Sequence, residues 1–326
     1  MARLPRRKFL RMAAGALALP ALSHVASAQA YPSRPVTLIV FVPAGGSPDI
    51  SARLIGQALS QRLGQSVVIE NRPGAGGSLA LQAVARAPAD GYTLLLVAVP
   101  HAINVTLHQS SPVNVTRDIA PVAGIYTGTF VMVVSPSLPA RTLPEFIAYA
   151  KANPGKVNMT SSGAGNLSHL AGEMFKAMAG IEVVHVPYKG AVLAHAGLMA
   201  GEVHVMFDAM TSALPNIRSG RLRALAVTTA GRSQSLPDVP TVAESVPGYT
   251  VTSWLGIGAP AGTPGTIVDK LNREINAVLA DPAIRDRFAA LSSEPLVVTP
   301  AAFRTFIGAE AEKWGKVIRA TNIKTR

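Results

Sequence analysis

Two short stretches of the sequence combine glycines with the start of an expected helix, an arrangement that can bind anions. They are VPAGGSPD (42–49) and SSGAGNLSH (161–169). Glycines let backbone N–H groups approach a ligand closely, and the first helical turn presents unpaired N–H donors with a partial positive charge. The P-loop lysine and the G-x-G-x-x-G pattern are absent, so a nucleotide is not indicated. A plain strand-to-helix turn is the alternative for either stretch alone, but the repetition favours a clamp that holds an anion from both sides.

Two acids and a histidine stand beside these stretches. Asp49 is favoured as a residue that caps or stabilises its helix start. Asp208 ends an expected strand (203–208), where ligand contact and loop capping are equally consistent. His169 is favoured as a hydrogen-bonded residue that fixes its loop, although Ser168, His169 and Asp208 together are the alternative of a hydrolase set. No G-x-S-x-G elbow and no H-E-x-x-H spacing occurs, so we expect no catalysis, no metal and no cofactor.

The apolar pattern predicts the elements that position these groups. VTLIVFV (36–42) is typical of a parallel strand buried on both faces, and Ser47 as N-cap with Pro48 fits a helix after it. Strands and helices then alternate, which favours an α/β fold with ligand groups at the carboxyl ends of strands. The other expected strands are 66–70, 92–99, 130–135, 156–162, 182–186, 203–208 and 222–228, and the expected helices are 48–63, 79–87, 144–153, 168–179, 191–200, 264–279 and 300–319.

We expect these elements to form two lobes with a ligand cleft between them. Residues 31–130 would make lobe 1, residues 131–251 lobe 2, and residues 252–326 would return to lobe 1. Chain crossings near 130 and 252 would then form a hinge.

The first 30 residues have the composition of an export signal. A basic start is followed by a short apolar stretch (12–22) and by a cleavage site at Ala28-Gln29-Ala30. RRKFLRM resembles a twin-arginine signal, and ordinary secretion is equally consistent. We therefore expect a periplasmic protein, cleaved near Ala30, that begins at Tyr31.

The overall composition excludes several classes of protein. The chain has no cysteine, which excludes thiol catalysis, disulfides and thiolate zinc sites. Its formal net charge is +12, but the basic residues are scattered and aromatic residues make up 5%. A nucleic-acid partner needs clustered basic residues with aromatics for stacking, so none is expected.

The chain after the signal carries a resemblance in stretches that run in order along essentially its whole length, and three of these stretches make it specific. ENRPGAGG (70–77), HVPYKG (185–190) and LPDVPTVAE (236–244) together resemble the substrate-binding proteins of tripartite tricarboxylate transporters, the Bug family. The resemblance implies a class II periplasmic-binding-protein-like fold that closes on a small organic carboxylate and delivers it to a membrane permease. It implies no reaction. A sensor kinase that reads the closed form is the alternative partner, and a monomer is expected.

The resemblance also implies which residues contact the ligand, all of them in or beside loops that follow strands. In lobe 1 these are Ala44, Gly45, Gly46 and Asp49, with His101 and Ala102 in the loop after the third strand. In lobe 2 they are Ser161, Ser162, Gly163, Gly165 and Asn166, with His169 behind the loop, and Lys189 and Asp208 nearby.

Three expected pocket positions depart from the family pattern. Val42 and Met159 stand where members usually carry an aromatic residue, and Asn166 stands where they usually carry Ser or Thr. As a hypothesis, the pocket accepts a bulkier or more apolar acid than a compact dicarboxylate.

Overall fold

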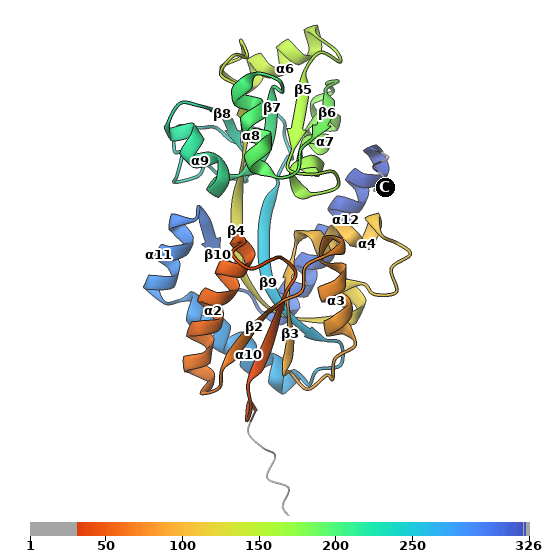
Figure 1. The fold of residues 1–326 in the computed structure, drawn as a ribbon, viewed down its shortest axis with the longest axis vertical. Coiled ribbons are helices and arrows are strands. Elements are labelled where there is room, and N and C mark those ends of the chain that lie inside the picture. Colours follow the sequence, from red (N-terminus) through yellow and green to blue (C-terminus); the bar gives the residue numbers. More distant parts are fainter. Residues whose placement is uncertain (1–30, 322, 324–326) are drawn as a thin grey trace, which may run out of the picture.

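The computed structural model of the protein describes residues 31–321 and 323, so the expected export signal at 1–30 lies outside the described residues. The chain forms two lobes that lie one above the other along the long axis of the molecule (Figure 1). Each lobe is a β-sheet with helices packed against it, as expected for an α/β protein. Within the described residues, none of the helices is long and apolar enough to cross a bilayer.

The lower lobe in Figure 1 holds the first strands and the last helices of the chain. Its sheet has the order β2-β1-β3-β9-β4, in which β1 pairs in parallel with β2 and β3, and β9 is antiparallel to β3 and β4. Its strands are β1 (Val36–Val40), β2 (Val67–Asn71), β3 (Thr93–Ala98), β9 (Thr252–Pro260) and β10 (Ser293–Pro295), which pairs with β4. Its helices are α2 (Ser47–Leu63), η1 (Ala75–Gly77), α3 (Ser78–Ala85), α4 (Val99–Leu107), α5 (Val115–Asp118), α10 (Gly265–Leu279), α11 (Pro282–Ala290) and α12 (Pro300–Thr321).

The upper lobe is built from the middle of the chain (Figure 1). Its strands follow the order β4-β7-β5-β6, in which β5 is parallel to both β6 and β7, and β8 also pairs with β4. These strands are β5 (Asn158–Ser161), β6 (Val184–Pro187), β7 (Val205–Ala209) and β8 (Arg223–Val227). The helices are α6 (Leu143–Ala152), α7 (Leu167–Ala179), α8 (Ala191–Ala200), α9 (Met210–Arg218) and η2 (Val242–Glu244).

One long strand, β4 (Ile119–Val134), belongs to both sheets. Its first part, to Thr129, pairs with β9, and its last part, from Phe130, pairs with β7. Backbone bonds continue the ladder at this point, because Thr228 donates to Phe130 and Val251 donates to Thr228, both at 2.9 Å. The lobes are therefore joined by hydrogen-bonded strands.

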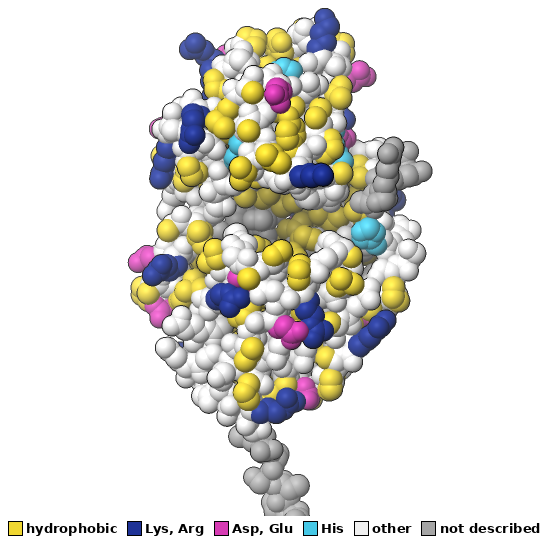
Figure 2. Space-filling view, viewed as in Figure 1, with side chains coloured by type: hydrophobic (Ala, Val, Ile, Leu, Met, Phe, Trp, Pro, Cys, Tyr) yellow, Lys and Arg dark blue, Asp and Glu magenta, His cyan; other side chains and the backbone are white. Residues whose placement is uncertain are grey.

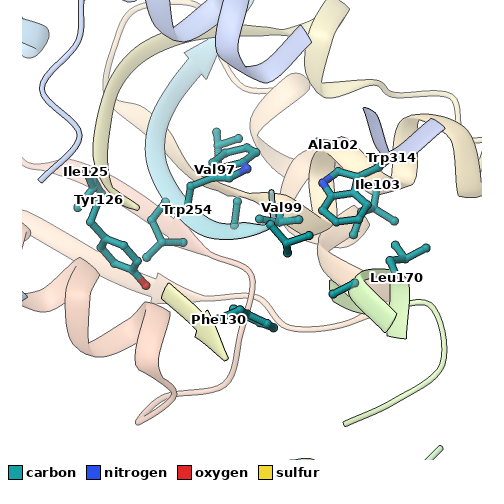
Figure 3. Close-up of a cluster of buried hydrophobic side chains, with 14 of the residues drawn as sticks. Val97, Val99, Ala102, Ile103, Ile125, Tyr126, Phe130, Leu170, Trp254 and Trp314 are labelled. Atoms are coloured by element: carbon teal, nitrogen blue, oxygen red, sulfur yellow. The ribbon is translucent and has the colours of Figure 1, made fainter. Parts of the chain in front are cut away.

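The buried apolar cluster also extends from one lobe into the other. Figure 3 shows Leu170, from α7 of the upper lobe, in the same cluster as Ile103 of α4 and Trp314 of α12. Trp254 of β9 joins this cluster beside Phe303 and Phe306, with ring centroids 6.1 and 5.4 Å away. The packing of α12 against both α4 and α7 thus supports the region between the lobes.

Several expected elements differ from those observed. Gly46, not Ser47, is the N-cap of α2, because its backbone is extended and its carbonyl accepts the N–H of Ile50 at 3.0 Å. Helices α4, α9 and α11 were not expected at all. The expected strand 130–135 is only the last part of the much longer β4.

Candidate ligand-binding site

The two glycine-containing stretches face the space between the lobes. The first follows β1 and leads into α2, and the second follows β5 and leads into α7. Figure 1 shows β1 running toward the upper lobe and β5 running toward the lower lobe, so both loops lie at the carboxyl ends of parallel strands. Figure 2 shows that the molecule is hollowed between the lobes on this face. The fold thus brings the expected anion loops together at one cleft.

Asp49 holds the first loop in shape. Its carboxylate accepts hydrogen bonds from the Gly45 N–H and from Asn71 Nδ2, both at 2.8 Å, and pairs with the Arg53 guanidinium at 2.9 Å. The side chain is buried, and burial by itself would raise its pKa. The bonds from Arg53, Gly45 and Asn71 outweigh burial and hold the pKa of Asp49 at about 2. The anionic carboxylate therefore binds its own loop.

This arrangement decides which backbone donors of the first loop remain for a ligand. Gly45, with φ +84°, adopts a conformation that favours glycine, and its N–H points at Asp49. The Gly46 N–H lies 3.4 Å from the Pro43 carbonyl, a long contact. Pro48 has no N–H, so the first turn of α2 offers the N–H groups of Ser47 and Asp49, which have no intrahelical partner.

The second loop is closed by side chains from its own helix start. Asn166 is the N-cap of α7: its Oδ1 accepts the His169 N–H at 3.1 Å, and its Nδ2 donates to Ser162 Oγ at 2.8 Å. His169 Nδ1 accepts the Gly165 N–H at 3.1 Å. Gly163 and Gly165 have φ values of +152° and +77°. The loop is thus held in a defined shape that presents the first turn of α7 to the cleft.

A histidine that the sequence reasoning missed lies directly beneath this loop. His185 of β6 has Nε2 2.7 Å from Ser161 Oγ, and its ring stacks on His169 with centroids 3.7 Å apart. Burial, and then the neighbouring His169, lower the pKa of His185 to about 4. His185 belongs to the HVPYKG motif, but its partners are distant in sequence, so no local spacing signals the contact.

Asp208 is bound to the upper lobe itself. Its Oδ2 lies 2.8 Å from His195 Nε2 and accepts the hydroxyl of Ser212, at the start of α9. Asn216 Nδ2 lies 3.1 Å from His195 Nδ1, which extends the network. This buried network holds α8, β7 and α9 together, and His195 was not singled out from the sequence.

The alternative of a hydrolase set does not match the geometry. The Ser168 hydroxyl donates to the Phe207 carbonyl at 2.5 Å. His169 bonds to Gly165 and faces Glu173, whereas Asp208 pairs with His195. A nucleophile–base–acid relay needs these groups bonded in sequence, and the structure pairs each of them elsewhere.

His101 and Ala102 were expected in a loop after the third strand, but the structure has a helix there. Both lie in the first turns of helix α4, and both side chains are buried, at 1% and 0% exposure. His101 Nδ1 accepts the Ala98 N–H at 3.0 Å, and the ring packs edge-on against Phe41. Burial lowers the pKa of His101 to about 4. His101 therefore caps its own helix.

Met159 was expected at a pocket position, but it lies in the core. Its side chain is buried beneath α7, where a Cβ built on Gly172 would lie 2.0 Å from Met159 Sδ. Val42 is half-buried and packs against the core at the start of the first loop. Lys189 is exposed in the turn before α8, and the Gly190 N–H beside it donates to the Ser162 carbonyl at 3.2 Å.

The described residues contain no cluster of three or more His, Asp or Glu side chains that could hold a metal ion. A groove of about 420 Å³ lies between α7 and α12, away from both loops. Its lining is mainly apolar and includes Met174 and Val317. This groove therefore lies apart from the two loops described above.

Comparison with known proteins connects this geometry to a family. The profile described as "Tripartite tricarboxylate transporter family receptor" matches residues 51–323. Protein BugT of Bordetella pertussis is 39% identical over 313 residues, which are 95% of this chain and 96% of BugT. A Pseudomonas sp. (strain P51) protein from the tcbD-tcbE intergenic region is 38% identical, with 98% and 95% covered.

Solved structures agree with this match. Rpa4515 of R. palustris, solved with adipate, is 37% identical and superposes with a TM-score of 0.79, covering 90% of this chain and 99% of that one. MatC from Rhodopseudomonas palustris, solved with bound malate, is 32% identical with a TM-score of 0.74, covering 88% and 100%. Sequence profile, relatives and fold all agree: the chain belongs to the tripartite tricarboxylate transporter receptor family, whose members are receptors and not enzymes.

Proposed function

We propose that this protein binds a small organic carboxylate between its lobes in the periplasm and delivers it to a membrane permease of the tripartite tricarboxylate type. The observation that carries the proposal is the pair of loops after β1 and β5, one from each lobe, which lie on the facing ends of the two lobes (Figure 1), where the surface is hollowed (Figure 2). Each loop leads into a helix start, where unpaired N–H groups and the helix dipole favour an anion. Relatives solved with adipate and malate support an organic acid as the ligand.

The proposed ligand contacts are mainly backbone donors. In the lower lobe they are the N–H groups of the first turn of α2, which Ala44, Gly45 and Gly46 lead into, with Asp49 holding the loop from behind. In the upper lobe they are the loop 162–166 and the first turn of α7, with Ser162 as a side-chain partner. The exposed ammonium of Lys189 stands beside this loop and attracts an acid without binding it rigidly.

The lobes are proposed to move about the crossings of β4 and β9. Residues 31–130 and 252–326 would form one body and residues 131–251 the other, so that closure brings the two loops onto the ligand. Of the three departures from the family pattern, only Val42 still supports the hypothesis of a bulkier acid. Met159 lies beneath α7, and the Asn166 side chain caps that helix.

A thermal-shift comparison tests the proposal. The chain from Tyr31 onward would be heated with adipate, with malate and with the neutral diamides of the same skeletons. At about 100 times its dissociation constant, a ligand stabilises the folded form by about 2.7 kcal/mol, which raises the melting temperature by several degrees. We expect a shift with an acid and none with its diamide. Equal shifts with acid and diamide, or no shift with any of a broad set of mono-, di- and tricarboxylates, would contradict a carboxylate receptor.

A further inference from the structure

The loop after β5 rests on two stacked imidazole rings whose role the proposed function leaves open. His169 comes from α7 and His185 from β6, and their rings are nearly parallel, with 10° between the planes and 3.7 Å between the centroids. His169 is 7% exposed, and His185 is partly buried beside it. Two elements thus bring their histidines together directly below the proposed carboxylate loop.

Each ring holds one end of the loop. At the first end, His185 Nε2 lies 2.7 Å from Ser161 Oγ, and that hydroxyl also bonds to both the carbonyl and the N–H of Gly163, at 3.1 and 3.3 Å. At the other end, His169 Nδ1 accepts the Gly165 N–H at 3.1 Å. The histidine pair therefore fixes both sides of Gly163, the centre of the loop.

These bonds require particular protonation states. An imidazole nitrogen accepts a hydrogen bond only when it carries no proton, so His169 has its proton on Nε2. Because the Ser161 hydroxyl donates to Gly163, His185 donates its Nε2–H to Ser161.

The charged groups around the pair act in opposite directions. Glu173 Oε1 lies 3.7 Å from His169 Nε2, and Lys176 neutralises Glu173 through a 3.0 Å ion pair. For His185, burial, His169 and Lys176 disfavour the charged ring, while Glu173 favours it. Two charged rings stacked at 3.7 Å would also repel each other strongly. For His185, the neutral ring is therefore the form that the surrounding groups favour.

We propose that His185 is a positioning residue for ligand binding. Together with His169 it fixes the loop from Ser161 to Gly165 in its binding form, and loss of its contacts loosens the loop and weakens binding. This inference rests on the proposed function, since it concerns the loop that would hold the carboxylate. His185 does not touch the ligand and acts through Ser161 and His169.

Two substitutions separate the two contacts of His185. His185→Phe keeps a flat ring against His169 but removes the N–H that reaches Ser161. His185→Gln restores an amide N–H near that position but removes the ring. His204→Phe is the matched control, because His204 Nδ1 accepts the Asn158 N–H at 2.8 Å at the opposite end of the same strand, β5.

Calorimetry with adipate, or with whichever acid gives the largest thermal shift, measures the effect at pH 7.5. We expect His185→Phe to weaken binding about tenfold, roughly the effect of one lost hydrogen bond. His185→Gln should recover part of this loss, and His204→Phe should bind like the unaltered protein. Ser161→Ala combined with His185→Phe should be no weaker than the weaker single variant, because both remove the same contact. Equal binding by His185→Phe and the unaltered protein would overturn the proposal.

Recovery in His185→Gln is the readout that a merely space-filling role of the ring would not give. Glutamine lacks the ring but carries an N–H that can donate to Ser161. Binding by His185→Gln that is no tighter than binding by His185→Phe would contradict the inference.

Hydrogen exchange of the Gly163 and Gly165 amides in the ligand-free protein separates this inference from the proposed function. We expect faster exchange of both amides in His185→Phe than in the unaltered protein, and exchange in His204→Phe like that of the unaltered protein. If no acid binds the unaltered protein but these amides respond as stated, the proposed function fails and the role of the pair in holding the loop stands. If an acid binds but the amides do not respond, only the role of the pair fails.

Discussion

Trp254, in strand β9, donates its indole N–H to Oε2 of Glu310, in helix α12, at 3.0 Å. The same oxygen accepts the indole N–H of Trp314 at 3.1 Å, and Lys313 pairs with the other oxygen. Glu310 is 7% exposed, so this carboxylate binds buried donors. It ties the last helix of the chain to a strand that runs between the lobes.

Replacing Glu310 with alanine is expected to cost about 2–4 kcal/mol of unfolding free energy. The substitution leaves two buried indole N–H groups without an acceptor, and each unsatisfied group costs about 1–3 kcal/mol. Urea unfolding measures the change. Glu312→Ala is the matched control, since Glu312 pairs with Lys316 on the surface with 67% of its side chain exposed, and exposed pairs of this kind contribute little to stability. Similar losses in both variants would contradict a special role for Glu310.

Gly172→Ala should destabilise the protein, whereas Gly308→Ala should stabilise it. A Cβ at position 172 would meet Met159 Sδ at 2.0 Å, and overpacking a core costs about 1–3 kcal/mol. Gly308 lies in α12, and outside the backbone of its own helix turns and its chain neighbours no atom lies within 4 Å of its Cβ position, so alanine gains up to about 1 kcal/mol in helix propensity. Melting temperatures of the two variants test the difference. Met159→Ala in the Gly172→Ala background should cost less than the sum of the single changes.

His101 makes stability depend on pH. Burial lowers its pKa to about 4 in the folded protein, against 6.5 for the free side chain. The contribution of neutral His101 to the free energy of unfolding is fully present above pH 6.5. It is lost as the pH falls toward 4, because the unfolded chain then binds a proton that the folded chain does not. His101→Asn keeps an acceptor for the Ala98 N–H and removes the titration. We expect urea midpoints of this variant to fall less steeply from pH 7 to pH 4.5 than those of the unaltered protein; parallel profiles would contradict this role.

Asp49→Ala should weaken carboxylate binding about tenfold or more by freeing the Gly45 N–H and the first loop. Asp90→Ala removes an exposed ion pair with Arg34 in the same lobe and should bind normally. The pKa of Asp49 is held at about 2 in the folded protein, against 3.8 for the free side chain. Its contribution to stability is therefore fully present above pH 3.8 and is lost as the pH falls from 3.8 through about 2. Calorimetry at pH 7 compares the two variants, and equal affinities would show that the Asp49 anchor is dispensable.

Local patterns predict much of the fold. The helix expected at 191–200 matches α8, and α7, α10 and β1 differ from expectation only at their ends. The misses have physical causes. Val99 starts α4 directly after β3 with no intervening turn, and α9 contains Pro215, which usually marks a helix end. The first part of β4 contains Pro121 and Gly124, two residue types that are unusual inside strands. The register with β9 shifts beside both of them, so the sequence there lacks the regular pattern of a strand.

The candidate site could be predicted only as far as local signals reach. The glycines at 45 and 165 adopt the left-handed conformation that marks a tight turn, so both loops were recognisable. The stacking of His169 on His185 and the pairing of His195 with Asp208 depend on how strands and helices pack, which no spacing in the sequence reveals. Met159 was misplaced for the same reason, because its direction is set by the close approach of α7 at Gly172.

Strand β4 links the stabilities of the two lobes. Residues up to Thr129 complete one sheet and residues from Phe130 complete the other, so the end of each sheet is continuous with the start of its neighbour. Fraying of one sheet at this point exposes the end of the other sheet, whereas a flexible linker would leave that end untouched. The continuous strand therefore couples the unfolding of the two lobes more strongly than a flexible linker would.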